Sequence, residues 1–263
     1  MNRENRVISL LTDFGLTDEY AGVMKGVILS HCLHAQLIDI SHNVPPQNIQ
    51  YAARLLQHSY KHFPVGTIHL IVVDPGVGSN RKIILIECSD HIFIAPDNGV
   101  LTPIIQSENL QRCYRLKDEY YCATSNTFHG RDIMAPIAGQ IATGIPPSQF
   151  GEEIDSADCV IVSFPGVKKI GETLFAEVTG VDHFGNIATS ITATDLSVLS
   201  GKIVFIIGSA TIRGLHKTYA EVPKGQMLAL IDSRGYVELS MNSGNAAKII
   251  DCVPGDPLQV KTE

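Results

Sequence analysis

The chain has 263 residues, of which 44% are hydrophobic and 18% charged, and this composition is typical of a globular protein. Its length allows a substantial core in one large domain or two smaller ones. The formal net charge of -7 argues against a broad cationic surface of the kind that binds nucleic acid or anionic lipid, so we expect neither as a partner.

In the first half of the chain, short strand-like apolar runs alternate with segments of helical periodicity. The predicted strands are residues 7–11, 36–40, 67–73, 82–87 and 91–95, and the predicted helices are residues 20–31, 46–62 and 132–142. Alternating strands and helices indicate an α/β fold with a doubly wound, mostly parallel sheet. In such sheets, ligands bind at the loops that leave the carboxyl ends of the strands.

From about Gly166 the pattern changes to short strands separated by turns. The predicted strands are residues 173–181, 186–190, 202–207, 226–232, 236–241 and 256–260. This spacing predicts a C-terminal antiparallel, β-barrel-like domain. We place the boundary at the Ser163-Phe-Pro-Gly166 turn, with an N-terminal α/β domain of residues 1–163 and a C-terminal domain of residues 164–263.

The cysteines and the apolar segments bear on cellular location. None of the six cysteines forms a Cys-x-x-Cys pair, which argues against a zinc ribbon or a thioredoxin-type site. No apolar stretch approaches the ~18 residues of a membrane span, and the polar start is unlike a signal peptide. We therefore expect reduced, mostly buried cysteines in a cytoplasmic protein that does not enter the membrane.

A polar loop at residues 11–18, directly after the first predicted strand, is the first candidate for chemistry. A carboxylate only accepts hydrogen bonds, so Asp13 suits a ribose diol, which offers two donors. The alternative is that Asp13 caps the helix that follows. For Asp18, the sequence alone favours capping of that helix or complementing its dipole over a ligand-binding role.

Two further loops, at residues 74–81 and 127–132, carry charged and imidazole side chains. Asp74 and Arg81 bracket a tight Pro-Gly and Gly-Ser turn, where they pair across a site or form an incidental ion pair on a surface hairpin. His129 stands among small residues at a predicted helix start, where it is either a catalyst or a polar loop residue. No Gly-Lys-Ser/Thr sequence follows the first turn, so it is not a phosphate loop.

A divalent metal site is the main alternative for these loops. The side chains with suitable donors are Asp13, Asp74, His129 and Asp132. Arg81 and Arg131 stand beside them, and their positive charge disfavours a bound cation. We therefore predict that the protein binds no metal and needs no cofactor.

Two turns in the second half complete the candidate residues. In the turn at residues 180–186, Asp182 can accept from an ammonium group, Phe184 can stack, and Asn186 offers both a donor and an acceptor. The turn at residues 241–247 is a second run of small polar residues. Taken alone, each turn is more typical of a structural hairpin than of a binding site.

Taken together, these residues resemble the family of S-adenosylmethionine hydroxide adenosyltransferases, which is related to fluorinating and chlorinating enzymes that use the same substrate. The matching segments are Leu11-Thr-Asp-Phe-Gly, Asp39-Ile-Ser-His, Val73-Asp-Pro-Gly-Val-Gly, Ala95-Pro-Asp-Asn-Gly, Thr127-Phe-His-Gly-Arg-Asp, Asp182-His-Phe-Gly-Asn and Gly244-Asn-Ala-Ala. They span nearly the whole chain in order, which makes the resemblance specific.

The resemblance implies hydrolysis of S-adenosylmethionine to adenosine and methionine. Water or hydroxide attacks ribose C5′ and displaces the neutral thioether, so no metal and no covalent nucleophile is required. Asp74 and His129 would orient the water and take its proton, while Arg81 would hold that network. The resemblance also implies a homotrimer, with substrate held between the N-terminal domain of one subunit and the C-terminal domain of its neighbour.

The resemblance also assigns substrate-binding residues. Asp13 would hold the ribose hydroxyls, Asp182 the methionine ammonium group, and Asn186 with the backbone of Ala246 the adenine edge. The remaining residues implied to contact substrate are Asp18, Ser233 and Arg234 at the methionine end, and Phe184, which packs on the substrate.

Three alternatives to hydrolysis remain open at this point. A halogenating enzyme carries tyrosine where Asp74 stands and a Tyr-Ser pair where His129-Gly130 stands, and a desolvated halide site would not tolerate the Asp74 carboxylate. A non-catalytic adenosine- or S-adenosylmethionine-binding protein would not need Asp74, Arg81 and His129 together. A metal-dependent phosphoesterase would lose activity in the presence of a chelator.

Overall fold

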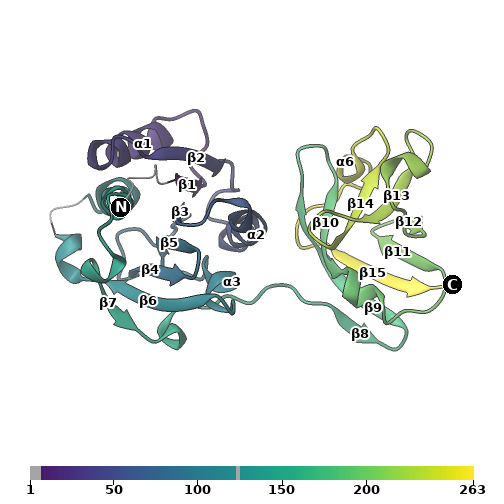
Figure 1. Cartoon of the computed structure of the whole chain (residues 1–263). Coiled ribbons are helices and arrows are strands. Elements are labelled where there is room, and N and C mark those ends of the chain that lie inside the picture. Colours follow the sequence, from purple (N-terminus) through teal and green to yellow (C-terminus); the bar gives the residue numbers. More distant parts are fainter. Residues whose placement is uncertain (1–6, 123–124) are drawn as a thin grey trace. The chain divides into compact units, whose positions relative to one another are not determined.

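The computed structural model describes residues 7–122 and 125–263 and is shown in Figure 1. The chain folds into two compact units, Met1–Val162 and Ser163–Glu263, which we call the N-terminal and C-terminal units. No helix within the described residues has the length and apolar character needed to cross a bilayer.

Seven strands of the described residues form the sheet of the N-terminal unit. They are β1 (Val7–Thr12), β2 (Gln36–Ser41), β3 (Thr67–Val72), β4 (Ile83–Cys88), β5 (His91–Pro96), β6 (Leu110–Leu116) and β7 (Gly151–Ile154). Their order is β2-β1-β3-β5-β4-β6-β7. Pairing is parallel from β2 to β5, whereas β4, β6 and β7 pair antiparallel. The prediction of an α/β fold with a largely parallel sheet is thereby confirmed.

Helices cover both faces of this sheet. The α-helices are α1 (Tyr20–His31), α2 (Ile49–Ser59), α3 (Thr102–Ile105) and α4 (Ala135–Ala142), with a π-helical turn η3 (Gly130–Met134) directly before α4. The 3-10 turns are η1 (Tyr60–His62), η2 (Asp118–Tyr121), η4 (Pro147–Gln149) and η5 (Ser156–Asp158). Met24 of α1 and Ile137 of α4 pack into one core with Leu10 of β1. Successive strand residues point to opposite faces. Ser9 therefore faces the side of α2, where it contacts His69 beside Tyr60.

The C-terminal unit is an antiparallel barrel that is nearly closed, which confirms the predicted character of this part of the chain. Its strands are β8 (Lys168–Ile170), β9 (Thr173–Val181), β10 (Ile187–Thr192), β11 (Ile203–Ile207), β12 (Ala210–Arg213), β13 (Met227–Ile231), β14 (Tyr236–Met241) and β15 (Pro257–Thr262). Their order is β12-β11-β15-β9-β10-β14-β13, with β8 paired to β9. The end strands β12 and β13 also contact each other. The short helices are α5 (Ala193–Leu196), η6 (Tyr219–Glu221) and α6 (Ala246–Ile250).

Helix boundaries differ from the prediction at two places, both beside the candidate site. The helix expected from residue 46 begins at Ile49, because Gln47 has a φ of 63° and Asn48 caps the helix by accepting from the Tyr51 amide at 2.9 Å. The helix expected from residue 132 is preceded by the π-helical turn from Gly130. His129 is the N-cap residue of this turn, so the helical segment begins two residues earlier than the 3.6-residue pattern predicts.

Candidate active site

The candidate site begins at the shared edge of two central parallel strands. β1 and β3 pair in register, with Thr12 opposite Val72, so the two chains leave the sheet at the same edge. Asp13 follows β1 directly, and Asp74 follows β3 after one further residue. Parallel pairing therefore brings these two carboxylates, 61 positions apart in the sequence, to neighbouring loops.

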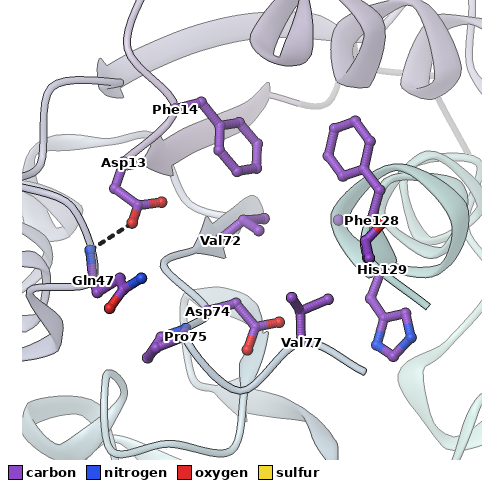
Figure 2. A pocket seen from close by; sticks show the side chains of 11 residues that line it. Asp13, Phe14, Gln47, Val72, Asp74, Pro75, Val77, Phe128 and His129 are labelled. Carbon is purple, nitrogen blue, oxygen red and sulfur yellow. Dashed lines mark hydrogen bonds between the residues drawn. The ribbon is translucent and has the colours of Figure 1, made fainter. Parts of the chain in front are cut away.

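A cavity of about 220 Å³ lies at this edge. Figure 2 shows the side chains that line it. Its lining residues are Asp13, Phe14, Gln47, Val72, Asp74, Pro75, Val77, Thr127, Phe128, His129 and Gly130. Residues of all three polar loops from the first half of the sequence therefore meet around one space. The wall combines apolar and aromatic surface with a few polar groups, which is typical of a small-molecule site.

Asp74, Arg81 and His129 form one buried network at this cavity. Arg81 Nε donates to Asp74 Oδ1 at 2.8 Å, and Arg81 Nη2 donates to Asp74 Oδ2. The same Nη2 lies 3.0 Å from His129 Nδ1. The side chains of Arg81 and Asp74 are 8% and 6% exposed, so the pair is shielded from water, unlike a surface hairpin pair. Asp74 and His129 line the cavity, and Arg81 holds them from behind.

Two neighbouring contacts fix the turn that joins Asp74 to Arg81. Gly78 has a φ of +77°, and a Cβ atom there would stand 2.3 Å from the Asn126 carbonyl oxygen, so only glycine fits. Asn98 Nδ2 donates to the Val73 carbonyl at 2.8 Å and supports the chain directly before Asp74. The Ala95-Pro-Asp-Asn-Gly motif thus supports the candidate site from outside the cavity.

The hydrogen-bond pattern determines which His129 nitrogen carries the proton. A guanidinium group can only donate, so Nδ1 of His129 accepts from Arg81, and a neutral His129 carries its proton on Nε2. Burial, followed by the positive charge of Arg81, lowers the pKa of His129 below its ordinary value of 6.5. His129 is therefore a neutral imidazole with an Nε2–H donor at neutral pH.

The two acids of the first loop occupy different environments. Asp13 lines the cavity, and its Oδ2 accepts from the backbone N–H of Gln47 at 2.7 Å, as the dashed line in Figure 2 marks. Asp18 is exposed and is not among the lining residues. Neither acid caps α1, because the N-cap residue is Glu19 and it makes no side-chain cap hydrogen bond.

Aromatic residues that the sequence patterns did not single out form one wall of the cavity. Phe14 and Phe128 meet edge to face with ring centroids 5.6 Å apart, and Tyr20 contacts both rings. The Arg131 guanidinium lies 5.0 Å from the centroid of Phe128, and Arg131 also pairs with Asp132. Both phenylalanines directly adjoin motif residues, Asp13 and His129, and that adjacency was the available signal.

In the C-terminal unit, Asp182 stabilises its own turn. Its Oδ1 accepts from the backbone N–H groups of Phe184 and Asn186 at 2.9 and 2.8 Å, and its Oδ2 accepts from Asn186 Nδ2 at 2.9 Å. Phe184 projects from this turn and is 73% exposed. The Gly185 carbonyl accepts from Ala247 N–H at 2.9 Å, which joins this turn to the start of α6, where Ala246 is fully buried.

Ser233 and Arg234 lie in a different turn of the same unit. Arg234 Nε donates to Asp232 Oδ2 at 2.6 Å, and Ser233 and Arg234 are both exposed. This turn precedes β14, whereas Ala246 follows it, so within one unit the two groups lie at opposite ends of β14. The structure therefore brings Asp182, Asn186 and Ala246 near one another and separates them from Ser233 and Arg234.

The geometry bears on the metal alternative. Within residues 7–122 and 125–263, no group of three His, Cys, Asp or Glu side chains is placed to hold a metal ion. Both Asp74 oxygens accept from Arg81, so this carboxylate already has a cationic partner. Asp132 Oδ2 accepts from the Ser125 amide at 3.0 Å and pairs with Arg131, outside the cavity lining.

Comparisons with known proteins agree with this arrangement. Residues 8–151 match the N-terminal domain of SAM hydroxide adenosyltransferases, and residues 176–259 match the C-terminal domain. A relative from Salinispora tropica, named (R)-S-adenosyl-L-methionine hydrolase, is 33% identical over 96% of this chain and 97% of its own length. A fluorinase from an Actinoplanes species is 25% identical over 92% of this chain and 93% of its own.

A solved structure shows the same fold in a protein of similar sequence. The crystal structure of an uncharacterized conserved protein from Thermotoga maritima superposes with a TM-score of 0.88 at 32% identity, and covers 97% of this chain and 99% of that one. The two domain matches together span most of the chain. The chain belongs to the SAM hydroxide adenosyltransferase family.

Proposed function

We propose that this member of the SAM hydroxide adenosyltransferase family hydrolyses S-adenosyl-L-methionine to adenosine and L-methionine. The observation that carries the proposal is the buried Asp74–Arg81–His129 network at a cavity that also contains Asp13. A protein that only bound adenosine would need Asp13 but would gain nothing from a shielded carboxylate and imidazole held by one guanidinium.

In the proposed reaction, a water molecule attacks ribose C5′ in line with the C5′–S bond. The C5′–O bond forms while the C5′–S bond breaks, and its electron pair neutralises the sulfonium, so methionine leaves as a neutral thioether. The leaving group needs no protonation and no Lewis acid. What remains for the protein is to hold the water in line and to accept its proton.

Asp74 is the group that we assign to proton acceptance. His129 Nδ1 already accepts from Arg81, so the nitrogen that remains is an Nε2–H donor, suited to orienting the water oxygen. Asp74 Oδ1 and Oδ2 each accept one bond from Arg81 and retain further lone pairs. The Arg81 guanidinium holds Asp74 and His129 in this arrangement, and its positive charge favours the hydroxide-like character that the water gains as its proton leaves.

For substrate binding, we propose that Asp13 accepts from the ribose hydroxyls. Gln47 N–H occupies one lone pair of Oδ2, which leaves capacity on both carboxylate oxygens for the two sugar donors. We further propose that Asp182, Phe184, Asn186, Ala246, Ser233 and Arg234 of a neighbouring copy complete the site in a homotrimer, with Asp18 at the methionine end. The exposure of Phe184 supports its proposed contact with ligand.

Halide transfer is less consistent with this site. Asp74 faces the cavity, and its negative charge would repel a desolvated halide ion. Two N–H groups of the Arg81 guanidinium, whose positive charge offsets that of Asp74, already donate to the two carboxylate oxygens of Asp74. A water molecule, which both donates and accepts hydrogen bonds, matches the Asp74 carboxylate and the His129 Nε2–H donor better than a halide, which only accepts.

The test is direct. Purified protein is incubated with S-adenosylmethionine, with and without a chelator and with and without chloride or fluoride, and the products are separated by chromatography. We expect adenosine and methionine in equal amounts, unaffected by the chelator. The proposal is wrong if no adenosine forms, if a 5′-halogenated nucleoside forms instead, or if the chelator abolishes turnover.

A further inference from the structure

The Asp39-Ile-Ser-His42 segment has no role in the reaction as proposed, although it ends on a buried imidazole near the site. Asp39 lies in β2, and His42 follows the strand with its side chain 1% exposed. Its Nδ1 lies 2.8 Å from Thr12 Oγ1, and its Nε2 makes a close polar contact with Asp39 Oδ1 at 3.0 Å. Thr12 is fully buried and directly precedes Asp13.

The Thr12 hydroxyl can act as a donor in the series of contacts that joins Thr12, His42 and Asp39. Its oxygen accepts from the Phe14 N–H at 3.3 Å, so its single proton is available for His42 Nδ1. A neutral His42 then carries its own proton on Nε2, which faces the Asp39 carboxylate. The three side chains thus lie in contact with one another in the order Thr12, His42, Asp39.

Lys25 contacts Asp39, the last member of this series of side chains. Its Nζ donates to Asp39 Oδ2 at 2.6 Å, and both side chains are about one-third exposed, at 32% and 37%. Burial tends to raise the pKa of Asp39, but its contacts with Lys25 and His42 together bring it below its ordinary value. Asp39 is therefore a carboxylate, able to orient the His42 ring.

Backbone hydrogen bonds connect the same two loops on either side of Asp13. The Gly15 N–H donates to the His42 carbonyl at 2.7 Å, and the Val44 N–H donates to the Thr12 carbonyl at 3.3 Å. Gln47, whose φ of 63° is rare for a residue with a side chain, directs its N–H to Asp13 Oδ2 at 2.7 Å. The loop after β2 therefore holds the chain before and after Asp13 as well as its carboxylate.

We propose that Asp39 and His42 are positioning residues that act through Thr12 to fix Asp13, and that they thereby set how strongly the site prefers a ribose with both hydroxyls over a deoxyribose. The inference rests on the proposed function for the role of Asp13. It differs from a purely structural role for His42, because loss of general stability would weaken adenosine and deoxyadenosine binding alike.

The experiment measures the dissociation constants of adenosine and 2′-deoxyadenosine by calorimetry, together with KM and kcat for S-adenosylmethionine and the melting temperature. Thr12→Val removes the hydroxyl at constant shape, His42→Gln and Asp39→Asn alter the next two members, and Thr12→Ser retains the hydroxyl. The matched control is His69→Gln, since His69 is equally buried and bonds Ser9 of the same strand at 2.6 Å. Asp39→Asn, at a partly exposed position, serves if a buried variant fails to fold.

We expect the wild type to bind adenosine about 10- to 100-fold more tightly than 2′-deoxyadenosine, the range for a hydrogen bond to a charged group. Thr12→Val, His42→Gln and Asp39→Asn will reduce this ratio at least threefold and raise KM more than they lower kcat. Thr12→Ser will retain the wild-type ratio. His69→Gln will lower the melting temperature with the ratio unchanged.

An unchanged ratio in Thr12→Val, His42→Gln and Asp39→Asn overturns the inference, even where those variants are less stable. If the wild type hydrolyses S-adenosylmethionine in that case, the proposed function stands and only the positioning role fails. A wild type that does not distinguish the two nucleosides overturns the role of Asp13 and this inference together. The ratio of the two nucleoside dissociation constants is measured without turnover, so it can still be determined in a variant that no longer hydrolyses S-adenosylmethionine.

Discussion

Replacing Asp74 with asparagine tests the proposed water activation at the group that we assign as the proton acceptor. Asparagine keeps the shape of the side chain but removes its charge and most of its basicity. In the structure, both carboxylate oxygens accept from Arg81, and the two side chains are 6% and 8% exposed. The substitution therefore changes both the chemistry and the balance of charge in a buried site.

The two effects have different sizes and can be separated. Loss of a general base lowers kcat by about 10²- to 10⁴-fold. Leaving the Arg81 charge buried without its partner costs about 3–5 kcal/mol of folding free energy, a large part of a typical stability of about 5–15 kcal/mol. A double variant, Asp74→Asn with Arg81→Met, removes the unpaired charge, so we expect it to recover stability without recovering turnover.

The assay is adenosine formation at saturating S-adenosylmethionine, with adenosine affinity measured on the same preparations. A matched control is Asp132→Asn, which also removes a carboxylate paired with an arginine, but one that is 20% exposed and outside the cavity lining. We expect that control to cost about 1 kcal/mol or less and to keep its turnover. If Asp74→Asn retains kcat within tenfold of the wild type, Asp74 is not the base.

Three further predictions concern the surroundings of the site and the core. Gly78→Ala will lower both the melting temperature and kcat, because a Cβ there meets the Asn126 carbonyl and shifts the turn between Asp74 and Arg81; wild-type values in both assays would refute this. Titration of His129 by NMR will give a pKa below 6.5 through burial and then Arg81, so the acid limit of kcat/KM lies below pH 6.5; a higher pKa contradicts the neutral assignment. Burial, with a smaller contribution from His91, lowers the pKa of His69 to about 3 in the folded state. The unfolded chain, with an ordinary pKa of 6.5, then binds more protons between pH 6.5 and 3, so the free energy of unfolding falls as pH falls through this window, by up to about 1.4 kcal/mol per pH unit. In chemical denaturation, His69→Gln will reduce the slope of the unfolding free energy against pH. An unchanged slope would show that a different titratable group causes this pH dependence.

Sequence periodicity predicted the α/β class and the barrel-like second half because the elements that define them are strongly patterned. The placement of Asp13 and Asp74 in neighbouring loops at one edge of the sheet also follows from the rule that parallel strands end together. The antiparallel half of the first sheet was harder to predict from the sequence. The strands β4 and β5 form a hairpin whose connection, Ser89 and Asp90, is not a characteristic turn sequence.

Residues of the site that the sequence patterns did not reveal depend on backbone geometry. Gln47 reaches the cavity because its φ is positive, which breaks the helix predicted from residue 46. Phe128 lines the cavity just before a π-helical turn, which has no strong sequence signature, whereas its neighbour His129 was predicted from the sequence. Asp18, Ser233 and Arg234 show a second limit of prediction from sequence. They match family motifs, but a motif match does not specify on which surface of the folded protein a residue lies.

The fate of water oxygen tests the proposed reaction most directly. The protein is incubated with S-adenosylmethionine in H₂¹⁸O, and the products are analysed by mass spectrometry. Attack of water at ribose C5′ predicts one ¹⁸O atom in the 5′-hydroxyl of adenosine and none in methionine, with label incorporation lost together with turnover in Asp74→Asn. Adenosine without ¹⁸O, label in the amino-acid product, or no adenosine at all would contradict the account.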